Sequence, residues 1–80
     1  MKVDIVGQEI RIGDYVAYTS GTLGIEFAKV SHYTPKRIGL HDRTAVPAPQ
    51  VLVLDPSMPK YISIVDELER RIEWHTRQKA

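Results

Sequence analysis

The sequence predicts a mainly β fold of the α+β class: a small, partly open antiparallel barrel of about five strands followed by a C-terminal amphipathic α-helix. Up to about residue 55, apolar residues alternate with polar ones and glycines interrupt them at short intervals, as in short antiparallel strands. From Lys60 onward the apolar period changes from two to about 3.6, the period of a helix. Eighty residues are the size of one domain, so we expect residues 1–80 to fold together, with the barrel in 1–55 and the helix in 60–79.

The β region divides at its turn signals. Val3 and Ile5 precede Gly7-Gln8, a two-residue combination that favours a hairpin turn. A second glycine turn is expected at Gly13-Asp14. After it, Val16 and Tyr18 are again two positions apart. Further strands are expected at residues 10–12, 24–33, 38–40 and 51–54.

Three segments carry more specific expectations. The strand at 24–33 changes its apolar parity near Ala28, which predicts a bulge or a sharp bend. Val51–Leu54 is apolar on both faces and is therefore expected to be the most buried strand. Residues 44–50 contain two prolines and are expected to form a stiff loop.

The C-terminal helix is expected to begin between Pro59 and Ser63. Its acidic and basic residues include pairs four positions apart with the acid on the N-terminal side, the orientation that stabilises a helix. Its apolar stripe can pack on the open face of the barrel or pair with a second helix, and the pattern satisfies both arrangements. The stripe consists of Tyr61, Val65, Leu68, Ile72 and His75.

Residues 10–18 read I-R-I-G-D-Y-V-A-Y, and Phe27–Val30 and Thr34–Ile38 follow. These segments resemble the opening of Src-homology-3-like (SH3-like) barrels, in which a G-D-x-V turn leads into the first core strand. The pattern is similar to that of KOW and Tudor modules and of small accessory proteins of tailed bacteriophages. It covers roughly residues 9–54. The resemblance implies a barrel fold and, for a phage protein, a role in modulating or inhibiting a host protein.

The composition favours binding over catalysis. Eleven basic and ten acidic residues leave a net charge of +1, and the absence of cysteine excludes disulfides and thiolate zinc sites. The three histidines show no ligand spacing, and no phosphate loop or nucleophile elbow is present. We therefore expect a non-catalytic protein with no cofactor and no metal site. Without an apolar leader or a long apolar run, it is expected to be cytoplasmic and not to contact a membrane.

The predicted helix offers one candidate docking surface. At about 100° per residue, Trp74 lies opposite the apolar stripe, beside Arg70 and Arg77. Tryptophan and arginine are the residue types that contribute most to protein interfaces. The sequence therefore predicts a binding site for another protein, or for a second copy of this chain, at Trp74, Arg70 and Arg77. The alternative is that the helix end folds down and Trp74 packs on the barrel rim.

A basic segment offers the second candidate surface, for nucleic acid or a small nucleotide. If strands pair as a hairpin around Thr34-Pro35, its side chains gather at one end of the barrel, where they can hold phosphates and stack a base. A solvated hairpin edge is the alternative interpretation. The segment consists of Lys29, His32, Tyr33, Lys36, Arg37, His41 and Arg43.

A third possibility is an aromatic cage for a methylated cation. It would need Tyr15, Tyr18, Phe27 and Tyr33 to converge, whereas aromatic residues in strands more often pack in the core or across strands.

Overall fold

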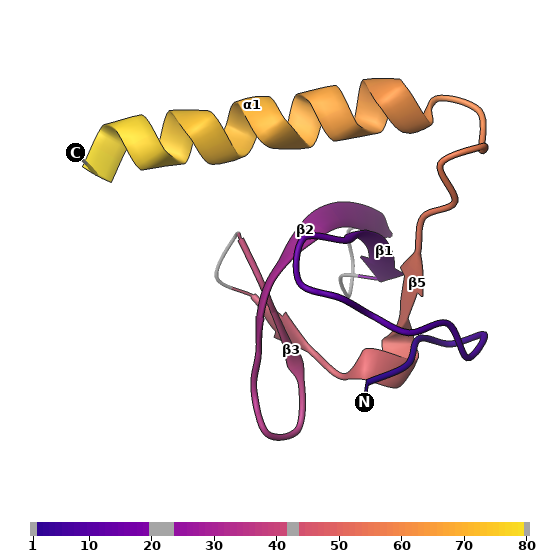
Figure 1. The fold of residues 1–80 in the computed structure, drawn as a ribbon. Helices are drawn as coiled ribbons and strands as arrows, with labels where there is room; N and C mark the ends of the chain where they lie inside the picture. Colours follow the sequence, from indigo (N-terminus) through magenta and orange to yellow (C-terminus); the bar gives the residue numbers. More distant parts are fainter. Residues whose placement is uncertain (1, 20–23, 42–43, 80) are drawn as a thin grey trace.

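The computed structural model describes residues 2–19, 24–41 and 44–79, except for the side chains of 75–79. Its strands are β1 (Tyr15–Thr19), β2 (Ile25–Tyr33), β3 (Ile38–Leu40), β4 (Ala45–Val46) and β5 (Val51–Val53), and its helix is α1 (Tyr61–Lys79). The strands form one antiparallel sheet in the order β4-β3-β2-β1-β5, which curls without closing, and α1 lies across its outer side (Figure 1). The predicted fold class is confirmed.

Strand β2 joins the two halves of the sheet. Its first part pairs with β1, from Ile25 to Lys29, and its second part pairs with β3. The register with β3 shifts between Val30 and His32, so the strand contains a bulge as predicted. The bulge does not lie at the parity change near Ala28, where the pairing with β1 is regular. At the bulge, the Val30 N–H donates to the carbonyl of Asp14 at 2.8 Å, and the Val30 carbonyl accepts from Gly13 at 2.9 Å. Gly13 has a φ of 97°, which explains why glycine occupies this turn.

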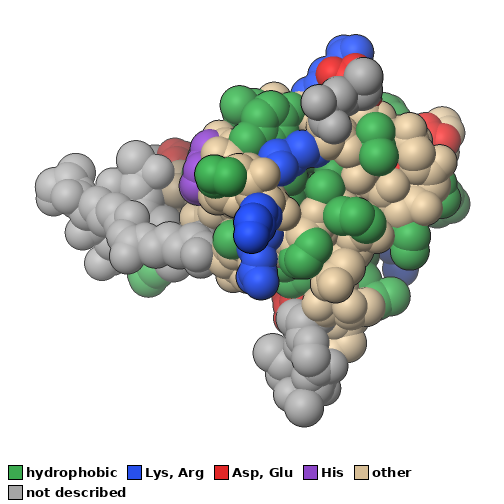
Figure 2. All heavy atoms as spheres, turned by 90° about the horizontal axis from the view of Figure 1, so that it is seen from below, with side chains coloured by type: hydrophobic (Ala, Val, Ile, Leu, Met, Phe, Trp, Pro, Cys, Tyr) green, Lys and Arg blue, Asp and Glu red, His purple; other side chains and the backbone are tan. Residues whose placement is uncertain are grey.

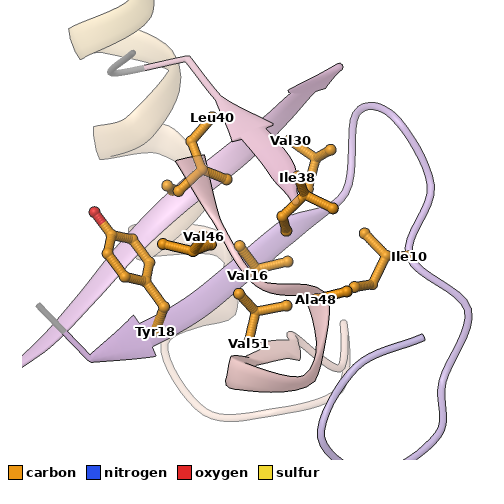
Figure 3. Packing of buried hydrophobic residues seen from close by; sticks show 10 residues of the cluster. Ile10, Val16, Tyr18, Val30, Ile38, Leu40, Val46, Ala48 and Val51 are labelled. Atoms are coloured by element: carbon orange, nitrogen blue, oxygen red, sulfur yellow. The ribbon is translucent and has the colours of Figure 1, made fainter. Parts of the chain in front are cut away.

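The core lies on the concave side of the curled sheet and is built from hydrophobic side chains, Tyr18 among them (Figure 3). It includes two residues from the segment predicted to be a loop, Val46 and Ala48, so that prediction is wrong in part. Val46 precedes a proline and is therefore extended, which lets β4 pair with β3, and Ala48–Gln50 forms a 3-10 turn. The buried cluster consists of Ile10, Val16, Tyr18, Ala28, Val30, Ile38, Leu40, Val46, Ala48 and Val51.

The sequence predicted that β5 would be the most buried strand, and this prediction is wrong. Among the described strands β5 lies at the end of the sheet and pairs only with β1. Val51 is completely buried and Leu54 nearly so, but Leu52 points away from the core and is 40 % exposed. The second apolar face of this segment therefore lies on the outer surface of the sheet.

The N-terminal segment forms a short version of the predicted hairpin and also covers the free edge of β5. An antiparallel bridge joins Val3 to Glu9, with a backbone hydrogen bond on either side of it. The strand expected at residues 10–12 does not form, and Ile12 is 61 % exposed. The backbone N–H of Ile5 donates to the Val51 carbonyl at 2.9 Å. This contact occupies an edge that would otherwise invite pairing with another chain.

Asp4 holds this edge through a buried carboxylate. Its oxygens accept hydrogen bonds from the backbone N–H groups of Val6 (3.0 Å), Gln8 (2.8 Å) and Val53 (2.9 Å), and from the Gln8 side-chain amide (3.1 Å). Burial alone would raise the pKa of Asp4, but these hydrogen bonds outweigh it and hold the pKa below its ordinary value. The charged carboxylate is therefore part of the folded structure.

Helix α1 begins at Tyr61, inside the predicted interval, and turns its apolar stripe toward the sheet. Leu68 is buried and Tyr61, Val65 and Ile72 are half-buried, which confirms the stripe to that point. The side chain of His75, its last predicted member, lies outside the described residues.

Replacing Asp4 with alanine should lower the free energy of unfolding by about 3 kcal/mol, because several charge-assisted hydrogen bonds are lost and buried N–H donors are left unpaired. The lowered pKa of folded Asp4 means that its contribution is complete above 3.8, the ordinary value, and is lost as the pH falls further. Urea denaturation at neutral pH and at about pH 3 measures both effects. Asp55→Ala is the control, since that exposed carboxylate accepts its hydrogen bonds from Ser57, two residues further along the same turn. Equal losses for the two variants would contradict the assignment.

Candidate functional site

The side of α1 that points away from the sheet is the first candidate surface. Ser63, Glu67, Arg70 and Trp74 are all exposed on this side, and we call them the outward face of α1. Trp74 is 58 % exposed, so its indole is not enclosed by the rest of the chain. The side chain of Arg77, predicted to belong to the same surface, lies outside the described residues.

A polar contact anchors α1 to the sheet and thereby sets which way this face points. Glu69 accepts a 2.7 Å hydrogen bond from the Lys29 ammonium on β2, and a second hydrogen bond from the Tyr15 hydroxyl on β1. The Lys29 and Tyr15 hydrogen bonds together hold the pKa of Glu69 below its ordinary value. The same Glu69 bond raises the pKa of Tyr15 to about 12, because ionised phenolate could not donate to the carboxylate.

Aromatic contacts support the same anchor. The rings of Tyr15 and Tyr61 meet edge to face, with centroids 6.2 Å apart, at the start of the helix. The Lys29 ammonium lies 5.5 Å from the centroid of the Tyr15 ring. A helix held at Tyr61, Leu68 and Glu69 cannot rotate about its axis without breaking these contacts, so Trp74 stays on the outside.

The basic segment does not gather in one place. Lys29 and His41 lie under α1, where both line a small cavity with Leu68 and Ile72. Lys29 is already paired with Glu69. The cavity has a volume of about 80 Å³, well below the roughly 300 Å³ at which ligand pockets begin, so it cannot hold a nucleotide.

The other members of the basic segment belong to the β2–β3 hairpin. Thr34 and Arg37 close its turn through backbone and side-chain hydrogen bonds, as predicted, and Lys36 and Arg37 are exposed. His32 is exposed nearby on β2, with its ring over Gly39, where an added Cβ would lie 2.2 Å from it. Arg43 lies outside the described residues. On the face opposite α1, Lys and Arg side chains are interspersed with apolar ones (Figure 2).

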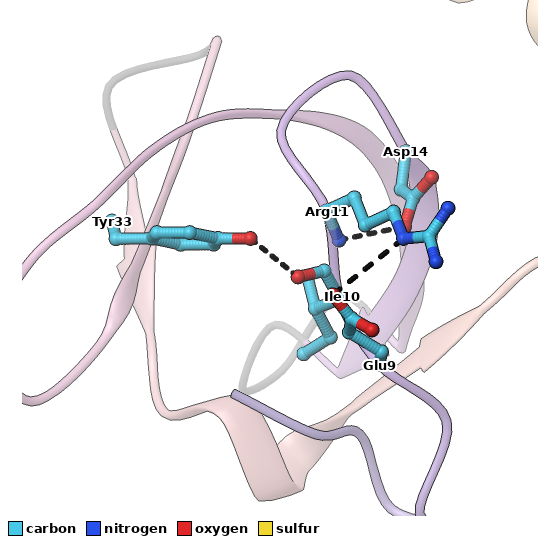
Figure 4. Close-up of polar contacts among 5 residues, drawn as sticks. All are labelled: Glu9, Ile10, Arg11, Asp14 and Tyr33. Atoms are coloured by element: carbon cyan, nitrogen blue, oxygen red, sulfur yellow. Dashed lines mark hydrogen bonds and ion pairs between the residues drawn. The ribbon is translucent and has the colours of Figure 1, made fainter. Parts of the chain in front are cut away.

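Tyr33 has a structural partner of its own. Its hydroxyl donates to the Ile10 carbonyl at 2.5 Å, so it ties β2 to the segment before β1 (Figure 4). In the same segment the Asp14 carboxylate accepts from the Arg11 backbone at 2.8 Å and closes the glycine turn. Tyr33 is 44 % exposed, which leaves part of its ring accessible for stacking.

The aromatic cage does not form. Tyr18 points into the core, whereas Tyr15 lies under α1 and Tyr33 bonds to the segment before β1. Successive residues of a strand point to opposite faces, so Tyr15 and Tyr18, three positions apart on β1, lie on opposite faces of the sheet.

A cleft of about 450 Å³ lies between the turn at Gly13, the end of β5 and the start of α1. Its charged lining residues are Asp14 and Asp55, both acidic. Two carboxylates repel phosphate, so this cleft does not favour a nucleotide.

An apolar groove on the outer face of the sheet was not predicted. It has a volume of about 220 Å³ and lies among Ile5, Ala17, Ile25 and Leu52. Ile5 and Ile25 are 65 % and 67 % exposed. The apolar second face of Val51–Leu54 was the signal for it, but burial was the simpler interpretation. Exposed apolar patches of this kind mark interaction surfaces.

The described part of the chain contains neither a candidate metal site nor a helix that could span a membrane. No group of three His, Asp or Glu side chains there could hold a metal ion. None of its helices combines the length and apolar character needed to cross a membrane.

Comparisons with known proteins leave the site to be interpreted from its own geometry: no protein-family model, curated protein or solved structure matches this chain.

Replacing Glu69 with glutamine should move the pKa of Tyr15 from about 12 back toward 10.0, because the charged acceptor is removed. In the wild type, the raised pKa stabilises the fold fully below pH 10.0 and the effect is lost as the pH rises through 12. Ultraviolet titration of phenolate absorbance measures this, with Tyr15→Phe identifying the late-ionising group. If Tyr15→Phe leaves the latest step of the titration in place, the Tyr15–Glu69 bond is not formed in solution.

Proposed function

We propose that this domain is a non-catalytic protein-interaction module that binds its partner through the outward face of α1. The observation that carries the proposal is the position of Trp74, which is 58 % exposed on a helix face that the sheet does not cover. A large aromatic side chain in water is costly, and such residues dominate the energy of protein interfaces. Arg70, one turn earlier, supplies a second residue type enriched at such interfaces.

The anchoring of α1 supports the same function. Because Glu69 bonds to both β1 and β2, the helix is presented in one orientation before a partner arrives. A surface that is already ordered loses less conformational entropy on binding. The apolar groove at Ile5, Ile25 and Leu52 adds a second surface of interface character on the sheet.

Nucleic-acid binding at the basic segment is less well supported. Phosphate recognition depends on several cations acting on one backbone. Here Lys29 is paired under the helix, and Lys36 and Arg37 stand apart from it on the hairpin. If the chain serves a phage against a host protein, as its resemblance to phage accessory proteins implies, the host protein would bind the outward face of α1.

Replacing Trp74 with alanine should reduce capture of the partner at least tenfold while leaving the melting temperature nearly unchanged, because the side chain contributes to binding and not to the core. The measurement is a pull-down from cell lysate by the immobilised domain, with and without nuclease. Ile62→Ala is the matched control, since Ile62 is an apolar helix residue 74 % exposed beside the outward face. Loss of capture in Ile62→Ala to the same extent would remove the special role of Trp74.

The double variant Lys36→Glu/Arg37→Glu tests the alternative in the same assay. We expect it to capture the partner as well as the wild type. If instead nuclease or this variant abolishes capture, and added salt weakens it steeply, then the hairpin binds nucleic acid and the proposed function is wrong.

A further inference from the structure

We propose that the outward face of α1 pairs with the same face of a second copy of this chain, with the two helices antiparallel across a two-fold axis. This inference rests on the proposed function and takes a second copy of the chain, in place of a host protein, as the partner of that face. The observation that supports it is the order of charges along the outward face of α1, where the acidic Glu67 precedes the basic Arg70 by one turn.

The intervals between the residues of the outward face are the same in both directions along the helix. Ser63, Glu67, Arg70 and Trp74 follow one another at intervals of four, three and four residues. Two antiparallel helices centred between positions 68 and 69 therefore bring each of these residues opposite a member of the same set. A seam of this spacing is the geometry by which paired helices contact one another.

In this register the charges are complementary. Glu67 faces Arg70 of the second copy, and Arg70 faces Glu67 of the second copy, so the two-fold axis repeats each attractive pair. A parallel pair would instead set like charges against each other. Antiparallel helix dipoles add to the preference. Glu67 also bonds to Arg71 of its own helix at 2.6 Å, which holds the carboxylate at the edge of the seam.

The same register gives Trp74 a partner site. It lies opposite Ser63 of the second copy, whose small side chain leaves room for an indole. The indole would then cover helix surface and be withdrawn from water at both ends of the seam. Burial of a large aromatic side chain is the main source of apolar energy in such a pair.

The described strands do not obstruct the approach of a second copy to the outward face of α1. All described strands lie on one side of α1 (Figure 1), so two copies joined at their helices carry their barrels on opposite outer sides. The bonds from Lys29 and Tyr15 to Glu69 keep the inner face of each helix on its own sheet. Self-association therefore requires no rearrangement of the domain.

The test is sedimentation velocity of the purified domain over a range of concentrations, together with the fluorescence of its single tryptophan. The wild type should form a reversible dimer, and the emission should shift to shorter wavelength as the dimer forms. Glu67→Arg and Arg70→Glu should each weaken the dimer about tenfold, because each replaces two attractive pairs with two repulsive ones. An equimolar mixture of the two variants should regain association, since every facing pair is again Glu against Arg.

Lys36→Glu is the matched control, because it makes the charge change of Arg70→Glu on the exposed hairpin and should not alter association. Circular dichroism verifies that each variant keeps its helix. A wild type that stays monomeric, a mixture that associates no better than its components, or an equal effect of Lys36→Glu overturns the inference. If the wild type is monomeric but Trp74-dependent capture from lysate persists, only this inference fails. If that capture is absent too, the proposed function fails with it.

Discussion

Strand β2 is the element on which the rest of the molecule depends, because both of its faces are used. Ala28 and Val30 point into the core, and the bulge after Val30 allows one strand to pair with β1 and then with β3. On the opposite face Lys29 extends toward α1 and binds Glu69. The same nine residues therefore curve the sheet around its core and position the helix. A regular strand without the bulge could not bend to serve both halves of the sheet.

The contacts that attach the helix to the sheet decide which of its residues remain exposed. Leu68 supplies the buried apolar contact, Tyr61 meets Tyr15, and Glu69 accepts two hydrogen bonds from the sheet. Once these are made, the rotation of the helix leaves Trp74 and Arg70 pointing outward. The polar anchor thus links the stability of the domain to the orientation of the proposed binding surface, since loss of the Glu69 contacts would also release the outward face.

The distribution of charge and apolar area favours association with protein over association with phosphate. The described cations of the basic segment are divided between the underside of α1 and the hairpin, and Lys29 is paired with Glu69. Apolar area, in contrast, gathers on the outer surface, at Trp74 on the helix and at Ile5 and Ile25 on the sheet. Apolar area removed from water is the main driving force of protein association.

Periodicity in the sequence determined the order of the main strands, the C-terminal helix and the placement of Trp74 opposite the apolar stripe, because these follow from local spacing along a strand or a helix. Tertiary structure alone decided the rest. Val51–Leu54 is apolar on both faces in a buried strand and in an end strand alike, so only the neighbours of β5 showed that Leu52 is exposed. Likewise, Lys29 and Glu69 are forty residues apart, and no local pattern reveals that one neutralises the other. Spacing specifies which face a side chain occupies, but only the packing of distant elements specifies what covers that face.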